Sequence, residues 1–285
     1  MTITITAKEK AILEKVNIPP KPQALMTITL EAKKPEPDIK IIASAISEDP
    51  AISAAVMQVV NSVAFARRNK VTSIQQAVMT LGIKRVFPLV KAVALKSALP
   101  ANDDLKAFWQ SSSMVASACT MYCLLLNQPD LADNAYMLGL FHNAGVPIML
   151  QSFNGYHDIL SKGIAEGWQD INDLEQSQYQ TSHTILGALL AQQWQLPKAM
   201  IDVIYYFHDT DGIFTSGELS KVSLYLLAIL KLARSSVDGV LTGETNTPEW
   251  QLVQDPIFEL LNIDENKLDD MRNAIESKLT QDVDS

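Results

Sequence analysis

The residues best suited to chemistry in this chain are three of its four histidines, His142, His183 and His208. Imidazole titrates near neutral pH and is a common metal ligand. If the three rings converged with a water molecule, they would form a catalytic zinc site. The sequence places them on or beside helical patterns but does not show that they converge. The interpretation that we favour is a set of core or pocket histidines held by hydrogen bonds, and the zinc site is the alternative.

The other candidates for chemistry give weaker signals. The fourth histidine, His157, is interpreted as a surface residue. Cys119 and Cys123 lie four residues apart on one face of an expected helix, a spacing that does not suit a disulfide. We interpret them as buried thiols that act as small apolar groups, with a redox switch as the alternative. Ser111 and Ser182 have no Ser-His-Asp context, and the 11 glycines form no phosphate-binding loop, so nucleophilic catalysis is not indicated.

The elements that must position these residues are almost all expected to be helices. Apolar residues recur at spacings of three and four along most of the chain, which is typical of amphipathic and buried helices. An alternating strand pattern appears only in the Thr-Ile repeats at the start and around Met26. The expected helices nearest to the histidines cover residues 105–127, 131–144, 183–195, 197–208 and 218–236.

Several residue types mark the ends of expected helices. Asp49-Pro50 places a capping residue before a proline at the first helical position. Residues 73–76 match a capping box, and the helix that they open is expected to close at Gly82. Pro88 is expected to start or kink a helix rather than lie in its middle. Gly145 is expected to end a helix with a positive φ.

The composition predicts a globular protein of the cytoplasm. The chain has 285 residues, of which 47% are hydrophobic and 19% charged, so it can form a sizeable core. It has no apolar run of about 20 residues, so neither a membrane-spanning helix nor a membrane partner is expected. The start of the sequence lacks the pattern of a signal peptide. Two cysteines exclude a disulfide scaffold.

The charge is unevenly distributed along the chain. Residues 1–100 carry 14 basic and 7 acidic side chains, whereas residues 101–285 carry 9 and 25. We interpret this asymmetry as two lobes whose surfaces attract each other or a partner. The alternative is nucleic-acid binding by the basic lobe, but its best cluster, residues 67–70 with Lys84 and Arg85, is too sparse for a basic face. No nucleic-acid partner is therefore expected.

A polar break at residues 100–104 suggests where the lobes meet. We expect an N-terminal helical lobe over residues 1–100, a second helical lobe over 101–240, and a C-terminal helical extension over 241–285. The extension is expected either to pack on the core or to serve a partner.

Four segments share a characteristic order and spacing: Ile18-Pro-Pro-Lys-Pro22, Ile46–Ile52, Val60-Asn61-Ser62 and Ser73–Gly82. Together they resemble the bacterial HDOD domain, the HD-related output domain. The resemblance extends to residues 138–145, 183–190 and 194–197, and covers roughly residues 16–240. It implies an all-α, two-lobed fold related to the HD phosphohydrolases, which hold one or two divalent metals with His and Asp from several helices.

The resemblance also locates a candidate vestigial pocket. An amide, Asn143, stands where the family's metal-bridging Asp is expected, and no acid occurs between residues 219 and 236. A neutral amide is a poor ligand, and an arginine near a dication is repulsive. No metal ligand, catalytic residue or cofactor is therefore assigned. The positions that match the family's site are Ser111, His142, Asn143, His183, His208 and Arg234.

Two hypotheses for function follow, with a third held in reserve. The first is a non-enzymatic regulatory module of signal transduction that binds a signalling protein through its basic lobe or the cleft between lobes. The second is a ligand-sensing pseudoenzyme whose pocket binds a nucleotide or phosphate, with Arg234 as the anion partner. The third is a metal-dependent phosphohydrolase. The sequence does not specify the partner, pathway or ligand.

Overall fold

The computed structural model describes residues 16, 18–19, 22–61, 71–99, 105–166, 171–210 and 212–283. Every regular element in these ranges is a helix, which confirms the all-α prediction. The first group is α2 (Gln23–Ala32), α3 (Ile39–Ser47), α4 (Pro50–Val60), α5 (Ile74–Leu81) and α6 (Ile83–Ala98). The middle group is α7 (Lys106–Leu125), η3 (Pro129–Leu131), α8 (Ala132–Phe141), α9 (Gly145–Ser152), α10 (Tyr156–Glu166), α11 (Ile171–Tyr179), α12 (His183–Gln193) and α13 (Lys198–Tyr205). The last group is α14 (Lys221–Thr242), α15 (Pro248–Leu261) and α16 (Glu265–Val283).

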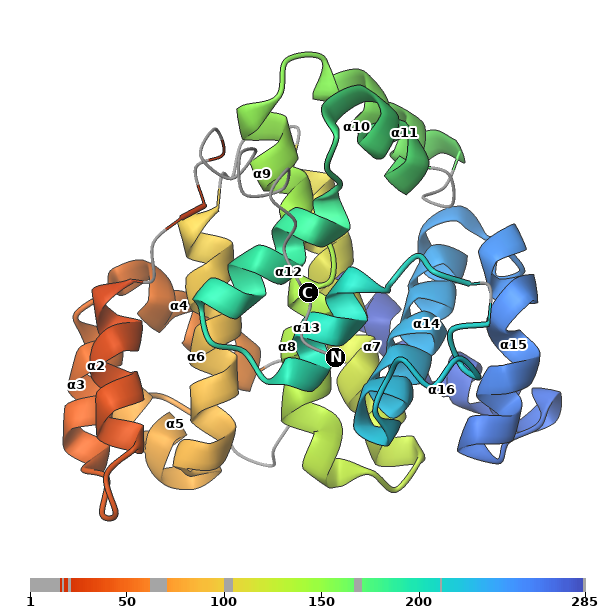
Figure 1. Cartoon of the computed structure of the whole chain (residues 1–285). Helices are drawn as coiled ribbons and strands as arrows, with labels where there is room; N and C mark the ends of the chain where they lie inside the picture. Colours follow the sequence, from red (N-terminus) through yellow and green to blue (C-terminus); the bar gives the residue numbers. More distant parts are fainter. Residues whose placement is uncertain are drawn as a thin grey trace.

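The helices are arranged around a central column. In Figure 1, α2–α6 lie on the left, α7, α8, α12 and α13 in the middle, and α14–α16 on the right. The N-terminal group joins the middle mainly where α6 packs against α8. The proposed lobe boundary at 100–104 lies outside the described residues, so the division into lobes stays a prediction. Within the described ranges, no helix has the length and apolar character needed to span a bilayer.

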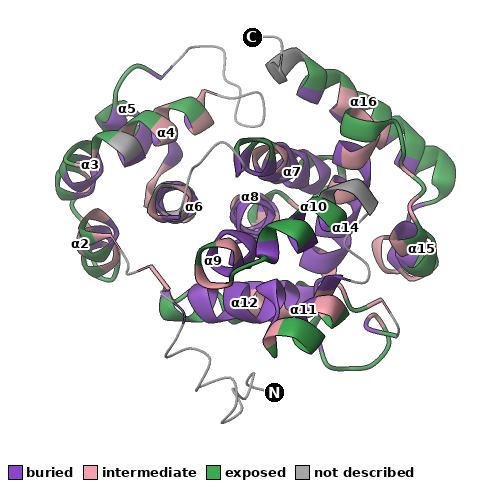
Figure 2. Cartoon of the chain, turned by 90° about the horizontal axis from the view of Figure 1, so that it is seen from above, coloured by how far each residue is buried: buried purple, intermediate pink, exposed green. Residues whose placement is uncertain are grey.

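Helix α8 lies in the middle of the molecule, surrounded by α6, α7, α9, α12 and α14 (Figure 2). From Ala135 to Phe141 its sequence is apolar and buried on every face, so its central position leaves no apolar face in water. Gly139 allows α8 to lie close to α7, because a Cβ there would be 2.6 Å from the Ala116 Cα. Helix α12 is buried from His183 to Ala191 for the same reason. The core thus carries both the His142 region and His183.

The helix starts follow the local chemistry of the sequence. The Asp49 carboxylate accepts a hydrogen bond from the amide three residues later, at 3.0 Å. Ser73 caps α5 by accepting from the Gln76 amide. The Gln76 side chain accepts from the Thr72 amide rather than from that of Ser73, so the capping box is shifted by one residue. Gly82 ends α5 with a φ of +74°, as expected.

The Asn61 side chain joins the end of α4 to the segment before α5. Its Nδ2 donates to the carbonyl groups of Met57 and Val71, both at 3.0 Å, and its Oδ1 accepts from the Val71 amide. The side chain therefore fastens the end of α4 to the start of the segment that leads into α5.

Three expectations about helix bounds were wrong. Pro88 lies inside α6, where it removes only the hydrogen bond to the residue-84 carbonyl while the rest of the helix packs against α8 and α4. Gly145 begins α9 rather than ending a helix, and its φ is not positive. A glycine is needed at this position because the start of α9 lies against the backbone of α12, where a Cβ atom would overlap the His183 carbonyl group. Helix α14 continues to Thr242 instead of ending at residue 236.

The basic cluster considered for nucleic acid is only partly described. Residues 67–70 lie outside the described ranges. Arg85 uses its charge inside the protein, because its Nε donates to both carboxylate oxygens of Asp133 at 3.2 and 3.0 Å. This ion pair fastens α6 to α8.

The C-terminal extension packs on the core. Helix α15 lies on α14, and α16 lies on α7 and α14. Both helices bury one apolar face, of which Trp250, Ile257 and Ile275 are parts. Arg272 of α16 donates to the Ser235 hydroxyl of α14 at 3.1 Å. These contacts place α15 directly over the part of α14 that carries Arg234.

Candidate functional site

His142 follows the last residue of α8 and is buried, with 1% exposure. Its Nδ1 lies 2.6 Å from the Gly139 carbonyl oxygen. Because a carbonyl only accepts, Nδ1 carries the proton and Nε2 is left with a lone pair. Nε2 has no hydrogen-bond partner among the described residues. Burial, and then the nearby Arg234 charge, lower the pKa of His142 to about 3, so the ring is neutral.

His183 begins α12 and is held by Glu175 of α11. The Glu175 carboxylate accepts a hydrogen bond from the His183 backbone amide at 2.8 Å. Its Oε2 and Oε1 atoms lie 2.8 and 3.0 Å from Nδ1 of the His183 ring. Tyr156 of α10 donates its hydroxyl to the same carboxylate at 2.6 Å. Both His183 and Glu175 are fully buried. The carboxylate therefore fixes the ring orientation and assigns the proton to Nδ1.

His208 lies just after α13 and contacts His183 directly. Their Nε2 atoms are 3.2 Å apart, a distance that requires one proton between them. Because the His183 proton is on Nδ1, the His208 Nε2 donates and the His183 Nε2 accepts. Burial lowers the pKa of His208 well below its usual value, with the neighbouring His183 as the next cause. On the other side, His208 Nδ1 lies 3.9 Å from Glu249 Oε1.

Helix α14 adds two cations to this region. Lys231 is 4% exposed; its Nζ donates to Glu249 and lies 4.6 Å from the centre of the Phe207 ring. Arg234, one turn later, lies 3.5 Å from the Asp238 carboxylate. Burial raises the pKa of Asp238, and Arg234 opposes that shift. Two successive turns of α14 therefore place fixed positive charge beside His208.

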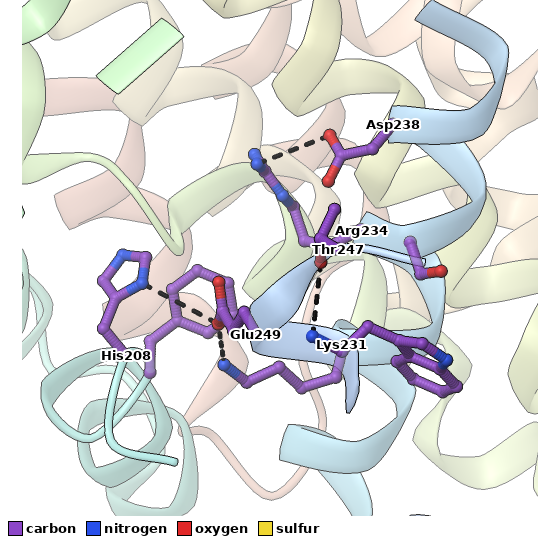
Figure 3. A pocket seen from close by; sticks show the side chains of 9 residues that line it. His208, Lys231, Arg234, Asp238, Thr247 and Glu249 are labelled. Carbon is purple, nitrogen blue, oxygen red and sulfur yellow. Dashed lines mark hydrogen bonds and ion pairs between the residues drawn. The ribbon is translucent and has the colours of Figure 1, made fainter. Parts of the chain in front are cut away.

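A small pocket opens between α14 and α15 (Figure 3). Its cavity volume is about 20 Å³, the space of about one water molecule. The figure shows the Glu249 carboxylate between His208 and Lys231. The lining residues are Phe207, His208, Lys231, Arg234, Ser235, Asp238, Thr247, Glu249 and Trp250.

The predicted site residues are divided between this pocket and the core behind it. His208 and Arg234 line the pocket, whereas His142, Asn143 and His183 are buried and are not part of its lining. Asn143 Oδ1 has no hydrogen-bond partner in the described part of the chain. Ser111 is partly buried on α7 and is not among the lining residues either. The structure brings His183 and His208 into contact. The His142 ring packs against the Phe207 ring, with 5.1 Å between the two ring centres, and Phe207 in turn packs against His208.

Three important residues were missed by the sequence reasoning. Glu175 shares the buried face of α11 with Ile171, an i, i+4 relation that singles it out from the exposed acids of that helix. Lys231 interrupts an otherwise apolar stretch of α14, one turn before Arg234. Glu249 shows no signal in the sequence, because its partners come from other helices.

The residues present do not fit a divalent metal. No three His, Cys, Asp or Glu side chains in the described ranges lie close enough together to hold an ion. His183 already uses Nδ1 for Glu175 and Nε2 for His208. The remaining neighbours are the neutral amide of Asn143, the two cations of α14, and the carboxylates of Glu249 and Asp238, which already face those cations. These side chains therefore favour the interpretation of hydrogen-bonded core histidines over the alternative of a three-histidine zinc site.

Comparisons with known proteins agree with this architecture. The HDOD domain model matches residues 18–210. A protein from Geobacter sulfurreducens, described as an HDOD domain protein with unknown function, has a similar structure with a TM-score of 0.62 and 19% identity, over 94% of this chain and 96% of that one. A proposed phosphohydrolase from Shewanella amazonensis SB2B gives a TM-score of 0.67 and 23% identity, over 94% and 98%.

Two further relatives are longer than this chain. A proposed signal transduction protein from Marinobacter aquaeolei VT8 gives a TM-score of 0.67 and 20% identity, over 97% of this chain and 60% of that one. An uncharacterized protein of Treponema pallidum (strain Nichols) is 25% identical over 194 residues, which are 68% of this chain and 38% of that protein. This chain thus corresponds to well under half of that relative.

Proposed function

The chain belongs to the HDOD domain family, and we propose that it is a non-enzymatic regulatory module of signal transduction that acts by binding another protein. The observation that carries this proposal is the set of charges around the histidines. Asn143, which the resemblance matches to the family's metal-bridging Asp, supplies no negative charge, and the neighbouring pocket contains the cations Lys231 and Arg234, which already face Glu249 and Asp238. A module of this kind transmits a signal by its shape and surface, without turnover.

Electrostatics supports the absence of a dinuclear metal site. Two unit charges about 4 Å apart interact by about 4 kcal/mol at an effective dielectric near 20, and a divalent ion doubles this repulsion. Lys231 is buried, so water does not screen its charge strongly. The Glu249 carboxylate is already paired with Lys231 and would have to leave it to serve a metal.

The cellular location and the partner are part of the proposal. Cys119 and Cys123 are both buried and unbridged, which suits a reducing compartment such as the cytoplasm. The opposite charges of residues 1–100 and 101–285 support recognition of a charged signalling protein. No nucleic acid or membrane is included among the partners.

Hydrolysis and metal content together test the proposal. Protein purified without a tag or chelator is assayed with bis(p-nitrophenyl) phosphate and cyclic dinucleotides, with Mg²⁺, Mn²⁺, Ni²⁺ or Zn²⁺ added. We expect no stoichiometric metal and no turnover that follows the protein peak in gel filtration. Turnover that follows the peak and disappears in His183→Ala would contradict the non-enzymatic assignment. The proposed binding of a signalling protein is tested separately, by crosslinking in cells followed by a binding titration with the purified partner.

A second candidate function is ligand sensing by a pseudoenzyme. The observation that favours it is a pocket lined by Lys231 and Arg234, with unpaired acceptors on His142 and Asn143 in the core behind it. A nucleotide does not fit the present cavity of about 20 Å³, so binding requires a side chain of the lining to move. A thermal-shift screen with nucleotides and inorganic phosphate tests this function, and the absence of any shift contradicts it.

A further inference from the structure

The Glu249 side chain enters the pocket from helix α15 and is partly exposed. It is the second residue of α15, directly after a short segment that joins α14 to α15. Its side chain is 22% exposed, whereas the Lys231 side chain that it contacts is 4% exposed. The carboxylate thus reaches in from the open side of the pocket, and the cation is fixed at the back.

Lys231 requires a negative partner in this position. Its ammonium group is buried, and a buried charge without a partner costs several kcal/mol. The Phe207 ring stabilises the cation from one side at 4.6 Å but does not neutralise it. The position occupied by the Glu249 carboxylate is therefore an anion-binding position.

Arg234 provides a second positive group at the same opening. It lies one turn from Lys231 on α14, so both side chains reach the same pocket. Its closest carboxylate oxygen, on Asp238, is 3.5 Å away, longer than the roughly 2.7–2.9 Å of a well-formed charge-assisted hydrogen bond. The guanidinium therefore keeps donor capacity for another anion.

We propose that Lys231 and Arg234 form a binding site for a phosphate group, and that Glu249 occupies this site as an internal competitor. The inference rests on the ligand-sensing candidate above and names its ligand chemistry. A phosphate group offers more acceptor atoms and more negative charge than one carboxylate, so it satisfies both cations at once. When phosphate enters, the Glu249 side chain moves toward solvent and its contact with α14 is lost. Ligand binding is thereby coupled to the packing of α15 on α14. Helix α15 lies outside residues 18–210, the part of the chain that matches the HDOD domain model.

The test removes the competing charge and keeps the shape. Glu249→Gln is compared with the wild type and with Glu259→Gln, which makes the same change at an exposed position of the same helix. Inorganic phosphate is titrated by calorimetry at constant ionic strength, with Trp250 in the pocket as a fluorescence reporter. We expect Glu249→Gln to bind phosphate at least about tenfold more tightly than both comparison proteins. Adding Lys231→Gln to Glu249→Gln should abolish the gain.

Equal affinity of a folded Glu249→Gln and Glu259→Gln for phosphate would overturn the inference. If Glu249→Gln is too unstable for titration, its melting temperature is compared in phosphate and in chloride at equal ionic strength. A larger phosphate-induced rise than in the wild type supports the site, and an equal rise overturns it. Adenosine monophosphate is the second ligand: tighter binding than inorganic phosphate assigns the site to phosphate esters, and equal binding assigns it to the phosphate group itself.

The same titration separates this inference from the proposed function. Release of adenosine from the ester, followed by chromatography, would contradict the non-enzymatic assignment but would leave the phosphate affinities of the variants as they were measured. Failure of every variant to bind phosphate would overturn the anion site and leave the regulatory module untouched.

Discussion

Replacing Gly145 by alanine should be the most damaging small substitution near the site. Gly145 begins α9, where the chain passes against the first turn of α12. A Cβ added there would lie 1.9 Å from the His183 carbonyl oxygen, 2.7 Å from the His183 carbonyl carbon and 2.8 Å from the Gly187 amide nitrogen. All three atoms belong to the backbone, so no side-chain rotation relieves the overlap. One of the two helices must move.

The magnitude follows from how far the helices must separate. Ordinary Cβ contacts are longer than about 3.4 Å, so the contact with His183 O requires a backbone shift of more than about 1 Å in a close-packed core. Overpacking of a core costs about 1–3 kcal/mol when side chains can adjust. Here they cannot, so we expect a loss of about 3 kcal/mol or more in the free energy of unfolding. The helix propensity gained by alanine, at most about 1 kcal/mol, offsets only part of this loss.

Urea unfolding followed by circular dichroism and by tryptophan fluorescence measures the effect. Two other glycines provide matched controls. Gly187→Ala should cost less than Gly145→Ala, because its nearest neighbour is an Ile204 methyl at 3.1 Å, which can adjust. Gly217→Ala should cost about 1 kcal/mol, because its φ is +77° but no atom lies within 4 Å. A Gly145→Ala variant within about 1 kcal/mol of the wild type would refute the close approach of α9 and α12.

Three further predictions concern the buried polar groups. Glu175→Gln should lower the free energy of unfolding by about 1–3 kcal/mol, because one amide oxygen cannot accept the three hydrogen bonds that the carboxylate receives from Tyr156 and His183; unchanged urea unfolding would contradict it. Since the pKa of His142 falls to about 3 in the folded protein, its contribution to stability is present above its unfolded value of 6.5 and is lost as the pH falls toward 3. The share of His142 in this loss should be about 1 kcal/mol between pH 7 and 5.5, and His208, whose pKa is also lowered, contributes over the same range; His142→Gln should therefore reduce the measured loss without abolishing it, whereas His157→Gln, at an exposed position, should leave it unchanged. Burial raises the pKa values of both cysteine thiols, that of Cys123 to about 12, so iodoacetamide at pH 8 should label them only after unfolding; fast labelling of the native protein would show that α7 opens.

Local sequence patterns were sufficient to predict where helices start, but they were not sufficient to predict which residues of different helices are in contact. Asp49 and Ser73 cap their helices because their partners are amides three residues away, within reach of any pattern-based reasoning. Gly145 was misjudged because a glycine fits equally a positive φ and a close approach, and only the position of α12 distinguishes the two. Glu249 was missed because Lys231, its partner, is on another helix, and sequence spacing carries no information about that contact.

The charge pattern of the site connects these observations to regulation. In an HD enzyme, carboxylates surround an exchangeable metal ion, so the positive charge can be lost. Here the positive charge belongs to Lys231 and Arg234 and is covalently fixed on α14, while the negative charge that balances Lys231 is carried by Glu249 on another helix. The exchangeable component of this site is therefore an anion. If a phosphate group replaces Glu249, the Lys231–Glu249 contact between α14 and α15 is removed, while the buried apolar faces of α15 and α16 and the Arg272 hydrogen bond remain. The extension would then report occupancy of the pocket, which would give the regulatory module that we propose a physical means of changing its surface.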